Sequence, residues 1–313
     1  MQLYLGVDGG GTKTRCLVVN EEGEYVGSAI AGPSNLTTNS EDIVAQSLKS
    51  ACRKALLGVA DEPHEIRAAC FSLAGSAAPE RQATLQDILA QLPFSFALKP
   101  ILTTDVEAAL NGAFLGKPGC ILIAGTGSIC MSIDNSGLQN RAGGLGAKLG
   151  DEGSGGWIGK QAILTAKQQA PDESLRSAVE HALAVPDITS FDSDSCTTRQ
   201  IAAISPEVFM LAEDGDAPSR KIMRDAINEL VKLVQAVKAK TDIDELPLAL
   251  TGGLISGNAQ FKQKLIAAIN EEVSGVQLQD LQLSALQGAA LTAWIADSSS
   301  PRSERFLKNL THA

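Results

Sequence analysis

One short loop decides how this sequence folds: Asp8-Gly9-Gly10-Gly11-Thr12-Lys13-Thr14, which follows an apolar stretch over residues 3–7. A P-loop or a dinucleotide-binding fingerprint would enter a helix after such a loop. Here residues 15–20 are rich in β-branched side chains, and a second such stretch begins after Glu21-Glu22-Gly23. This pattern predicts antiparallel strands joined by a glycine turn. Consecutive N–H groups in such a turn can bind an anion, because the missing side chains let a phosphate approach the backbone.

A second segment of the same design lies further along the chain. The apolar stretch 120–124 is followed by Gly125-Thr126-Gly127-Ser128, and then by another apolar stretch over 129–133. Two equivalent hairpins separated by about the length of a domain predict a duplicated architecture, in which each half offers a phosphate-binding turn to a shared cleft. Either segment alone could be an ordinary hairpin turn that contains glycine. Together they favour phosphate binding.

The remaining sequence alternates between helices and strands. Helical periodicity predicts helices over 43–59 and 220–240, and the apolar stretches 68–73 and 246–250 predict strands. Gly116-Lys117-Pro118-Gly119 is the expected hinge between two domains, which places the second domain over 117–296. The fold class is therefore α/β. Residues 169–196 show the weakest pattern, and we expect a mobile excursion there.

Composition excludes several classes of protein. The 313 residues carry 26 Lys plus Arg against 36 Asp plus Glu, a formal charge of -10, so we expect no nucleic acid partner. A secretory signal and a membrane span are both missing from the pattern, so we expect a cytoplasmic protein that contacts no membrane. The six cysteines contain no Cys-x-x-Cys pair and the three histidines are widely separated. Neither a His-rich metal centre nor a Ser-His-Asp triad is supported, and the chemistry must rest on carboxylates, hydroxyls and backbone groups.

These motifs, in this order, resemble the sugar-kinase and actin-like ATPase superfamily. The loop 8–14 is similar to its first phosphate motif, 124–128 to its second, and Leu250-Thr251-Gly252-Gly253 to the segment that those proteins place against adenosine. More narrowly, Thr104-Asp105 and the glycine-rich run 142–159 resemble the N-acetylglucosamine kinase and glucosamine kinase branch. That branch groups with the activator ATPases of benzoyl-CoA reductase and hydroxyacyl-CoA dehydratases.

The resemblance implies two RNase H-like domains around a nucleotide cleft. The first would span 1–116, and the C-terminal helix, about 297–313, would return to it. ATP and magnesium (Mg²⁺) are the implied cofactors. Asp8 would hold Mg²⁺ through water, since this ion loses its hydration reluctantly, although an Asx-turn role for Asp8 stays open. The implied nucleotide-binding residues are Gly10, Gly11, Thr12, Lys13, Gly125, Thr126, Gly127, Gly252 and Gly253.

Asp105 is the catalytic candidate. Phosphoryl transfer needs reactants in line, charge neutralisation and a group that accepts the alcohol proton. The family pattern implies that Asp105 accepts the proton of the hydroxyl on carbon 6 of a sugar. The alternative is that Asp105 only caps the helix starting at Val106. Asp151 has a helix-capping alternative of the same kind. The implied sugar-binding residues are Asn35, Gly75, Ser76, Asp105, Gly144, Asp151 and Glu152.

The resemblance thus implies an ATP- and Mg²⁺-dependent kinase that forms the 6-phosphate of N-acetylglucosamine or glucosamine. Ala74 departs from the family pattern, in which hexosamine kinases often have serine, so the preference at carbon 2 stays open. Two other functions are alternatives. An activator ATPase would need cysteine ligands for an iron–sulfur cluster near a dimer axis, and a sugar-sensing regulator would need a segment that touches DNA. The sequence also leaves a homodimer open.

Overall fold

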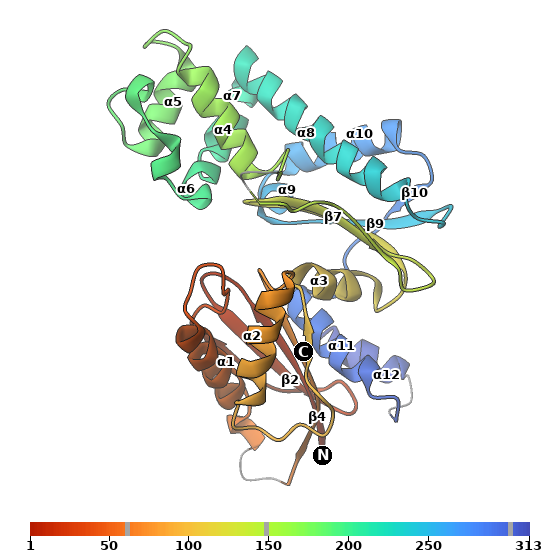
Figure 1. Cartoon of the computed structure of the whole chain (residues 1–313). Helices are drawn as coiled ribbons and strands as arrows, with labels where there is room; N and C mark the ends of the chain where they lie inside the picture. Colours follow the sequence, from red (N-terminus) through yellow and green to blue (C-terminus); the bar gives the residue numbers. More distant parts are fainter. Residues whose placement is uncertain (60–62, 147–149, 300–302) are drawn as a thin grey trace. The chain divides into compact units, whose positions relative to one another are not determined.

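The computed structural model describes the whole chain of 313 residues except 60–62, 147–149 and 300–302 (Figure 1). The chain forms two compact units. Unit 1 contains Met1–Pro118 and Asp280–Ala313, and unit 2 contains Gly119–Gln279. Each unit has its own five-stranded sheet with helices packed on it. The α/β class that the sequence predicts is confirmed.

The sheet of unit 1 has the order β3-β2-β1-β4-β5. Its strands are β1 (Gln2–Gly9), β2 (Thr14–Asn20), β3 (Tyr25–Ala31), β4 (Glu65–Leu73) and β5 (Ile101–Thr103). β1 pairs antiparallel with β2 and parallel with β4, and the pair of Gly9 with Thr14 ends the first hairpin. The glycine loop is therefore a hairpin turn, as predicted, and no helix follows it.

Both faces of this sheet are buried. Leu3, Leu5 and Val7 of β1 join one core with α1 (Glu41–Ala55) and α2 (Pro79–Ala90). Tyr4, between them in sequence, joins the core on the other face with α3 (Asp105–Phe114), α11 (Ala285–Ala296) and α12 (Glu304–Leu310). Successive side chains of a strand point to opposite faces, which produces this alternation. Figure 1 shows α1 and α2 on one side of the sheet and α11 and α12 on the other.

The C-terminal return to unit 1 is longer than the sequence-based boundary at about 297. The chain rejoins unit 1 at Asp280, so α11 belongs to unit 1 and not to the second domain. Small residues explain the difference, because a Cβ on Gly6 of β1 or on Gly288 of α11 would clash with backbone of the element opposite. Within the predicted terminal helix, residues 300–302 lie outside the described residues, and α12 begins at Glu304.

The sheet of unit 2 repeats the pairing of unit 1. Its order is β10-β9-β6-β7-β8, and β6 pairs antiparallel with β7 and parallel with β9. The strands are β6 (Gly119–Ala124), β7 (Ser128–Ile133), β8 (Gln139–Gly143), β9 (Leu246–Thr251) and β10 (Val276–Leu278). The second glycine segment is again the turn of a hairpin, which fulfils the expectation of two equivalent hairpins.

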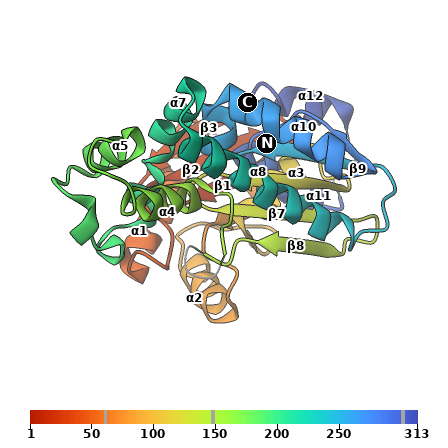
Figure 2. The ribbon, with the colours of Figure 1, turned by 90° about the horizontal axis from the view of Figure 1, so that it is seen from above.

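The helices of unit 2 pack on this sheet and on one another. They are α4 (Gly155–Ala166), α5 (Ser174–Leu183), α6 (Thr198–Ala202), α7 (Ser205–Asp214), α8 (Ala217–Lys238), α9 (Gly253–Gly257) and α10 (Ala259–Glu272). α8 lies along β7 and β8 (Figure 2). The apolar positions that predict this helix, from Ile222 to Val237, are buried. Across the part of the chain that the structure describes, no helix has both the length and the apolar character to cross a membrane.

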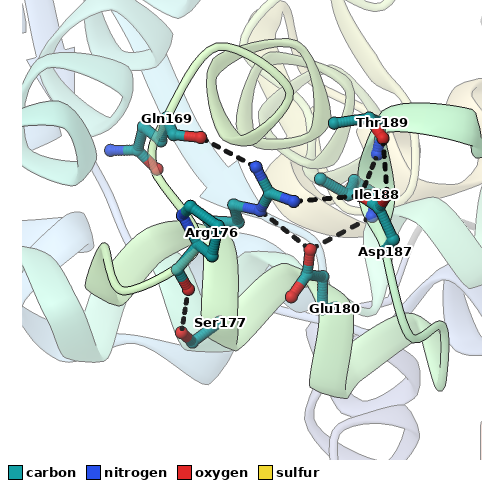
Figure 3. Close-up of polar contacts among 8 residues, drawn as sticks. Gln169, Arg176, Ser177, Glu180, Asp187, Ile188 and Thr189 are labelled. Atoms are coloured by element: carbon teal, nitrogen blue, oxygen red, sulfur yellow. Dashed lines mark hydrogen bonds and ion pairs between the residues drawn. The ribbon is translucent and has the colours of Figure 1, made fainter.

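A buried arginine organises the weakly patterned stretch 169–196 (Figure 3). The guanidinium of Arg176 donates to Glu180, to Asp187 and to the carbonyl oxygen of Gln169, over 2.9, 2.9 and 2.8 Å. Arg176 itself is 8% exposed. The stretch therefore has a defined polar centre, and its mobility stays a prediction.

Candidate functional site

The predicted site residues divide into two groups, one in each unit. In unit 1, the first glycine turn closes when Gly10 N–H donates to the carbonyl oxygen of Lys13 over 3.0 Å. Gly9 is enclosed, since a Cβ there would lie 2.6 Å from Leu73 Cδ2 and would clash with Ser34. Gly11, Thr12 and Lys13 are exposed. The turn is thus fixed at its base and accessible at its tip, as a phosphate-binding turn must be.

Asp8 is held by a basic neighbour that sequence reasoning missed. Arg15 lies directly across the hairpin from it, and Arg15 Nε donates to Asp8 Oδ2 over 3.1 Å, with a second contact from Nη2. An opposite charge at a facing strand position is the signal that could have revealed this pair. These hydrogen bonds join Asp8 to Arg15 and not to the loop backbone, so the Asx-turn alternative is not observed.

The surroundings of the Asp8 carboxylate fit a hydrated Mg²⁺. Arg15 binds Oδ2, which leaves Oδ1 to contact a water of the ion. Mg²⁺ usually keeps several waters and takes its other ligands from substrate phosphates. Among the described residues, no group of three or more His, Cys, Asp and Glu side chains could hold a metal by protein ligands alone. Asp8 therefore suits an ion that arrives with phosphates.

Three predicted sugar contacts gather beside the first turn. Gly75 has φ +79°, and a Cβ on it would lie 2.6 Å from Asn35 Oδ1. Ser76 Oγ donates to the carbonyl oxygen of Thr103 over 3.2 Å, which links this segment to the end of β5. The N–H of Ala74 donates to the carbonyl oxygen of Gly9 over 2.8 Å. These residues surround the carboxyl ends of β1, β4 and β5, which are parallel and share one edge of the sheet, where ligands of open α/β sheets bind.

Asp105 follows β5 at the same edge. Thr104 caps α3, because Thr104 Oγ1 accepts from the N–H of Glu107 over 3.2 Å, while Glu107 Oε2 accepts from the N–H of Thr104 over 2.7 Å. The alternative that Asp105 is the capping residue is therefore wrong. Asp105 is the first residue of α3 and half-buried, at the helix end whose dipole favours a negative charge.

In unit 2, the second glycine turn contacts the start of α4. Gly125 N–H donates to the carbonyl oxygen of Gly127 over 2.9 Å. Gly155 and Gly156 donate their N–H groups to the carbonyl oxygens of Gly125 and Thr126, over 2.8 and 3.1 Å. These bonds fix the turn while the carbonyl oxygens point towards the helix.

The predicted sugar residues of unit 2 lie against this turn. A Cβ on Gly127 would lie 2.8 Å from Asp151 Oδ2. Burial raises the pKa of Asp151, although backbone hydrogen bonds from Ser128 and Gly146 favour its charged form. Ser154 is the cap of α4, accepting from Trp157 N–H over 3.1 Å, and the carbonyl oxygen of Asp151 accepts from Ser154 N–H over 3.1 Å, so Asp151 contributes its backbone to the start of the helix.

Glu152 and Gly144 are tied to the same strand end. Ser128 Oγ donates to the carbonyl oxygen of Glu152 over 2.7 Å, and Gly144 N–H donates to the carbonyl oxygen of Ser128 over 2.8 Å. Within the run 142–159 that carries the resemblance, residues 147–149 lie outside the described residues.

A cavity of about 480 Å³ lies in unit 2, next to the second turn. Three predicted nucleotide residues line it together, Gly125, Thr126 and Gly253. Gly127 and Gly252 do not line it. Gly252, with φ +105°, packs on the backbone of Ala124.

Sequence reasoning missed most of the cavity wall. The segment that contains α6 and α7 supplies Arg199, Ala202, Ala203, Ser205, Pro206, Phe209, Met210 and Glu213. No local motif marks these residues. They reach the turn through a long-range contact, since a Cβ on Gly155 would lie 3.4 Å from Ala202 Cβ.

Comparisons with known proteins show which proteins this chain is similar to. The chain is 27% identical over 303 residues to an N-acetylmuramic acid/N-acetylglucosamine kinase of Clostridium acetobutylicum, covering 94% of this chain and 98% of that protein. It is 30% identical over 246 residues to glucosamine kinase GspK of Vibrio cholerae, covering 77% and 82%.

Solved structures share the fold. One from Chromobacterium violaceum superposes with a TM-score of 0.73 at 28% identity, covering 93% of this chain and 98% of that one. A ROK family glucokinase from Streptomyces griseus, solved with glucose and AMPPNP, gives a TM-score of 0.57 at 17% identity, covering 94% and 98%, and shows the fold alone. The model of the BadF/BadG/BcrA/BcrD ATPase family matches residues 5–293, and the chain therefore belongs to this family.

Proposed function

We propose that this protein is an ATP-dependent kinase that phosphorylates an amino sugar, N-acetylglucosamine or glucosamine, on the oxygen of carbon 6. The observation that carries the proposal is the cavity of unit 2, which Gly125, Thr126 and Gly253 line together. The sugar class is supported by the curated relatives, which are named as kinases of N-acetylmuramic acid, N-acetylglucosamine and glucosamine.

The proposed reaction is a direct transfer. The oxygen on carbon 6 attacks the γ-phosphorus of ATP, the bond from that phosphorus to the β,γ-bridging oxygen breaks, and ADP leaves. Asp105 accepts the proton of the attacking hydroxyl. Its place as the first residue of α3 supports this role, because Thr104 caps the helix without it.

Contacts to the sugar would come from both groups of residues. Asn35 Oδ1 already accepts from the N–H and Oγ1 of Thr37, over 2.8 and 2.7 Å, so its amide nitrogen would donate to a sugar hydroxyl. Gly75, Ser76, Gly144, Asp151 and Glu152 would complete the set. A buried hydroxyl without a partner costs about 1–3 kcal/mol, which is how such contacts generate selectivity.

The triphosphate would be bound by glycine turns. Gly10, Gly11, Thr12 and Lys13 would offer backbone donors and one positive charge, and the turn 125–127 would offer further backbone donors. Magnesium, when bound, would neutralise charge on the phosphates, with Asp8 as its protein ligand through water. Gly252 and Gly253 would lie by adenine and ribose. The cytoplasmic location and the homodimer remain predictions.

The kinase is favoured over the activator ATPase. Cys120 and Cys130 are the candidate cluster ligands of unit 2, with Sγ atoms 3.4 Å apart and both residues fully buried. Burial raises the pKa of Cys130 well above its usual value, and both side chains pack among the apolar residues of unit 2. This pair behaves as part of the hydrophobic core.

The test is a panel of sugars with the purified full-length chain, ATP and MgCl₂. N-Acetylglucosamine, glucosamine, N-acetylmannosamine, N-acetylmuramic acid and glucose are compared side by side. ADP release is followed by a coupled assay, and the sugar phosphate is identified by mass spectrometry and phosphorus NMR. We expect an amino sugar to give the highest kcat/KM. Rapid ATP hydrolysis with no phosphorylated sugar in any arm would contradict the proposal.

A further inference from the structure

The cavity of unit 2 is lined by two side chains of opposite charge that have no role in the proposed reaction. Arg199 on α6 and Glu213 on α7 both line it. Within the described part of the chain, neither side chain forms an ion pair or a side-chain hydrogen bond. A ligand in the cavity can therefore meet a hydrogen-bond acceptor and a donor that no protein group occupies.

The direction of α7 places Glu213 far from the phosphate turn. Ser205, the first residue of α7, lies beside the turn, since a Cβ on Gly155 would be 3.5 Å from Ser205 Oγ, and Gly155 donates to Gly125. Glu213 comes eight residues later, which is about 12 Å along a helix that rises 1.5 Å per residue. A nucleotide with its phosphates at Gly125 and its body along α7 would bring its base to Glu213.

The side chains between these two ends suit a flat ring. Phe209 and Met210 line the cavity from α7, together with Leu254 of α9. Phe209 is held by Phe261 of α10, with ring centroids 5.1 Å apart. Met210 is 52% exposed, and a bound base would cover its apolar side chain. The cavity therefore offers apolar stacking in the middle and polar selection at the end.

We propose that Glu213 selects adenine over guanine in the bound nucleotide. Its carboxylate accepts a hydrogen bond from the exocyclic 6-amino group of adenine. Guanine carries a carbonyl oxygen at the same position, so two acceptors would face each other and remain unpaired. This inference rests on the proposed function, because it takes the ligand of the cavity to be the kinase's nucleotide.

The experiment measures nucleotide binding by calorimetry, separately from sugar turnover. The full-length chain is titrated with ADP and with GDP, as wild type, Glu213→Gln and Glu213→Lys. We expect ADP to bind wild type at least about tenfold more tightly than GDP. The Gln amide can both accept and donate, so Glu213→Gln should reduce the preference about tenfold, and the Lys ammonium should favour GDP.

A matched control is the neighbouring carboxylate Asp214, which is exposed and does not line the cavity. Asp214→Asn removes the same charge one residue away and should keep the preference within about twofold of wild type. A third ligand, 2′-deoxy-ADP, tests whether Glu213 binds the ribose. If Glu213→Gln weakens the binding of ADP and GDP equally, and does not weaken the binding of 2′-deoxy-ADP, then Glu213 contacts the ribose. That result would overturn base selection.

The outcomes separate this inference from the kinase proposal. An unchanged ADP preference in both Glu213 variants overturns the inference while sugar phosphorylation can still be observed. A shifted preference without any phosphorylated sugar supports the inference and contradicts the kinase. Circular dichroism of each variant checks the fold, and an exposed residue near the end of α7 should tolerate these changes. Absence of any nucleotide binding would contradict both.

Discussion

The two glycine hairpins have the same strand pairing and different surroundings. The first turn, between β1 and β2, is exposed at its tip and has the Asp8–Arg15 pair at its base. The second turn, between β6 and β7, is bonded to the start of α4 and borders a cavity. A shared local pattern therefore sets the backbone of both turns, whereas more distant segments determine which chemical groups surround each turn.

The units also differ in how the chain builds them. Unit 2 is one continuous segment, and unit 1 is completed by α11 and α12 from the far end of the sequence. Polar as well as apolar contacts join the C-terminal segment to the sheet of unit 1. Arg67 of β4 donates to Asp297 over 2.8 Å, and Tyr4 of β1 donates to the same carboxylate over 2.9 Å. Asp105, the proposed proton acceptor, and Asp297, which links β1 and β4 to the C-terminal segment, can thus be tested separately.

The largest effect is expected at Asp105. If unit 1 supplies the proton acceptor, Asp105→Asn should lower kcat by roughly 10²- to 10⁴-fold, because the amide cannot accept the hydroxyl proton. The coupled assay with the preferred sugar measures this loss, and thermal unfolding checks that the fold is intact. Asp87→Asn on the exposed face of α2 is the control and should keep wild-type turnover. Near-normal turnover of Asp105→Asn would remove this residue from the mechanism.

A smaller effect, on stability, is expected at Asp297. Hydrogen bonds from Arg67, Ser299 and Tyr4 hold the pKa of this buried carboxyl well below its usual value. A carboxyl with a lowered folded pKa stabilises the fold above its unfolded pKa of about 3.9 and loses that contribution as the pH falls. We expect Asp297→Asn to cost about 2 kcal/mol at neutral pH and to flatten the fall in Tm between roughly pH 5 and 3.

The control for Asp297 is a surface pair of unit 2. Asp225 contacts Lys221 over 2.6 Å, but the lysine side chain is 68% exposed. Asp225→Asn should change the unfolding free energy by less than about 0.5 kcal/mol at any pH, because exposed ion pairs contribute little. Equal losses in both variants would mean that the link between β4 and the C-terminal segment is no stronger than a surface contact.

The sequence predicts features that depend on neighbouring residues better than features that depend on distant segments. Local patterns predicted both hairpins and α8, since each depends on the spacing of neighbouring residues. Long-range packing determined what was missed. The place of α11 depends on Gly6 and Gly288, and the walls of the cavity depend on α6 and α7 reaching Gly155. No short sequence motif indicates such contacts. The two turns could therefore be predicted from the sequence, but the residues around them could not.

The smallest effect compares the two turns directly. Gly127→Ala places a Cβ 2.8 Å from the Asp151 carboxylate, whereas the nearest atom to a Cβ on Gly10 is the carbonyl oxygen of Lys13 at 4.0 Å. Either the turn or Asp151 must shift in Gly127→Ala, so we expect its KM for ATP to rise about tenfold. Gly10→Ala meets open space and should raise KM by no more than about threefold.

Initial rates at varied ATP and saturating sugar measure both KM values, and kcat should change less than KM in each variant. If Asp151 contacts the sugar as proposed, its displacement in Gly127→Ala would also weaken sugar binding, so the KM for sugar is measured beside that for ATP. Equal KM values for ATP in the two variants would contradict the difference in crowding. If the KM for ATP rose more in Gly10→Ala than in Gly127→Ala, the first turn would be the tighter contact for phosphate. The space around Gly10 is open, so an added methyl group there could clash only with the ligand.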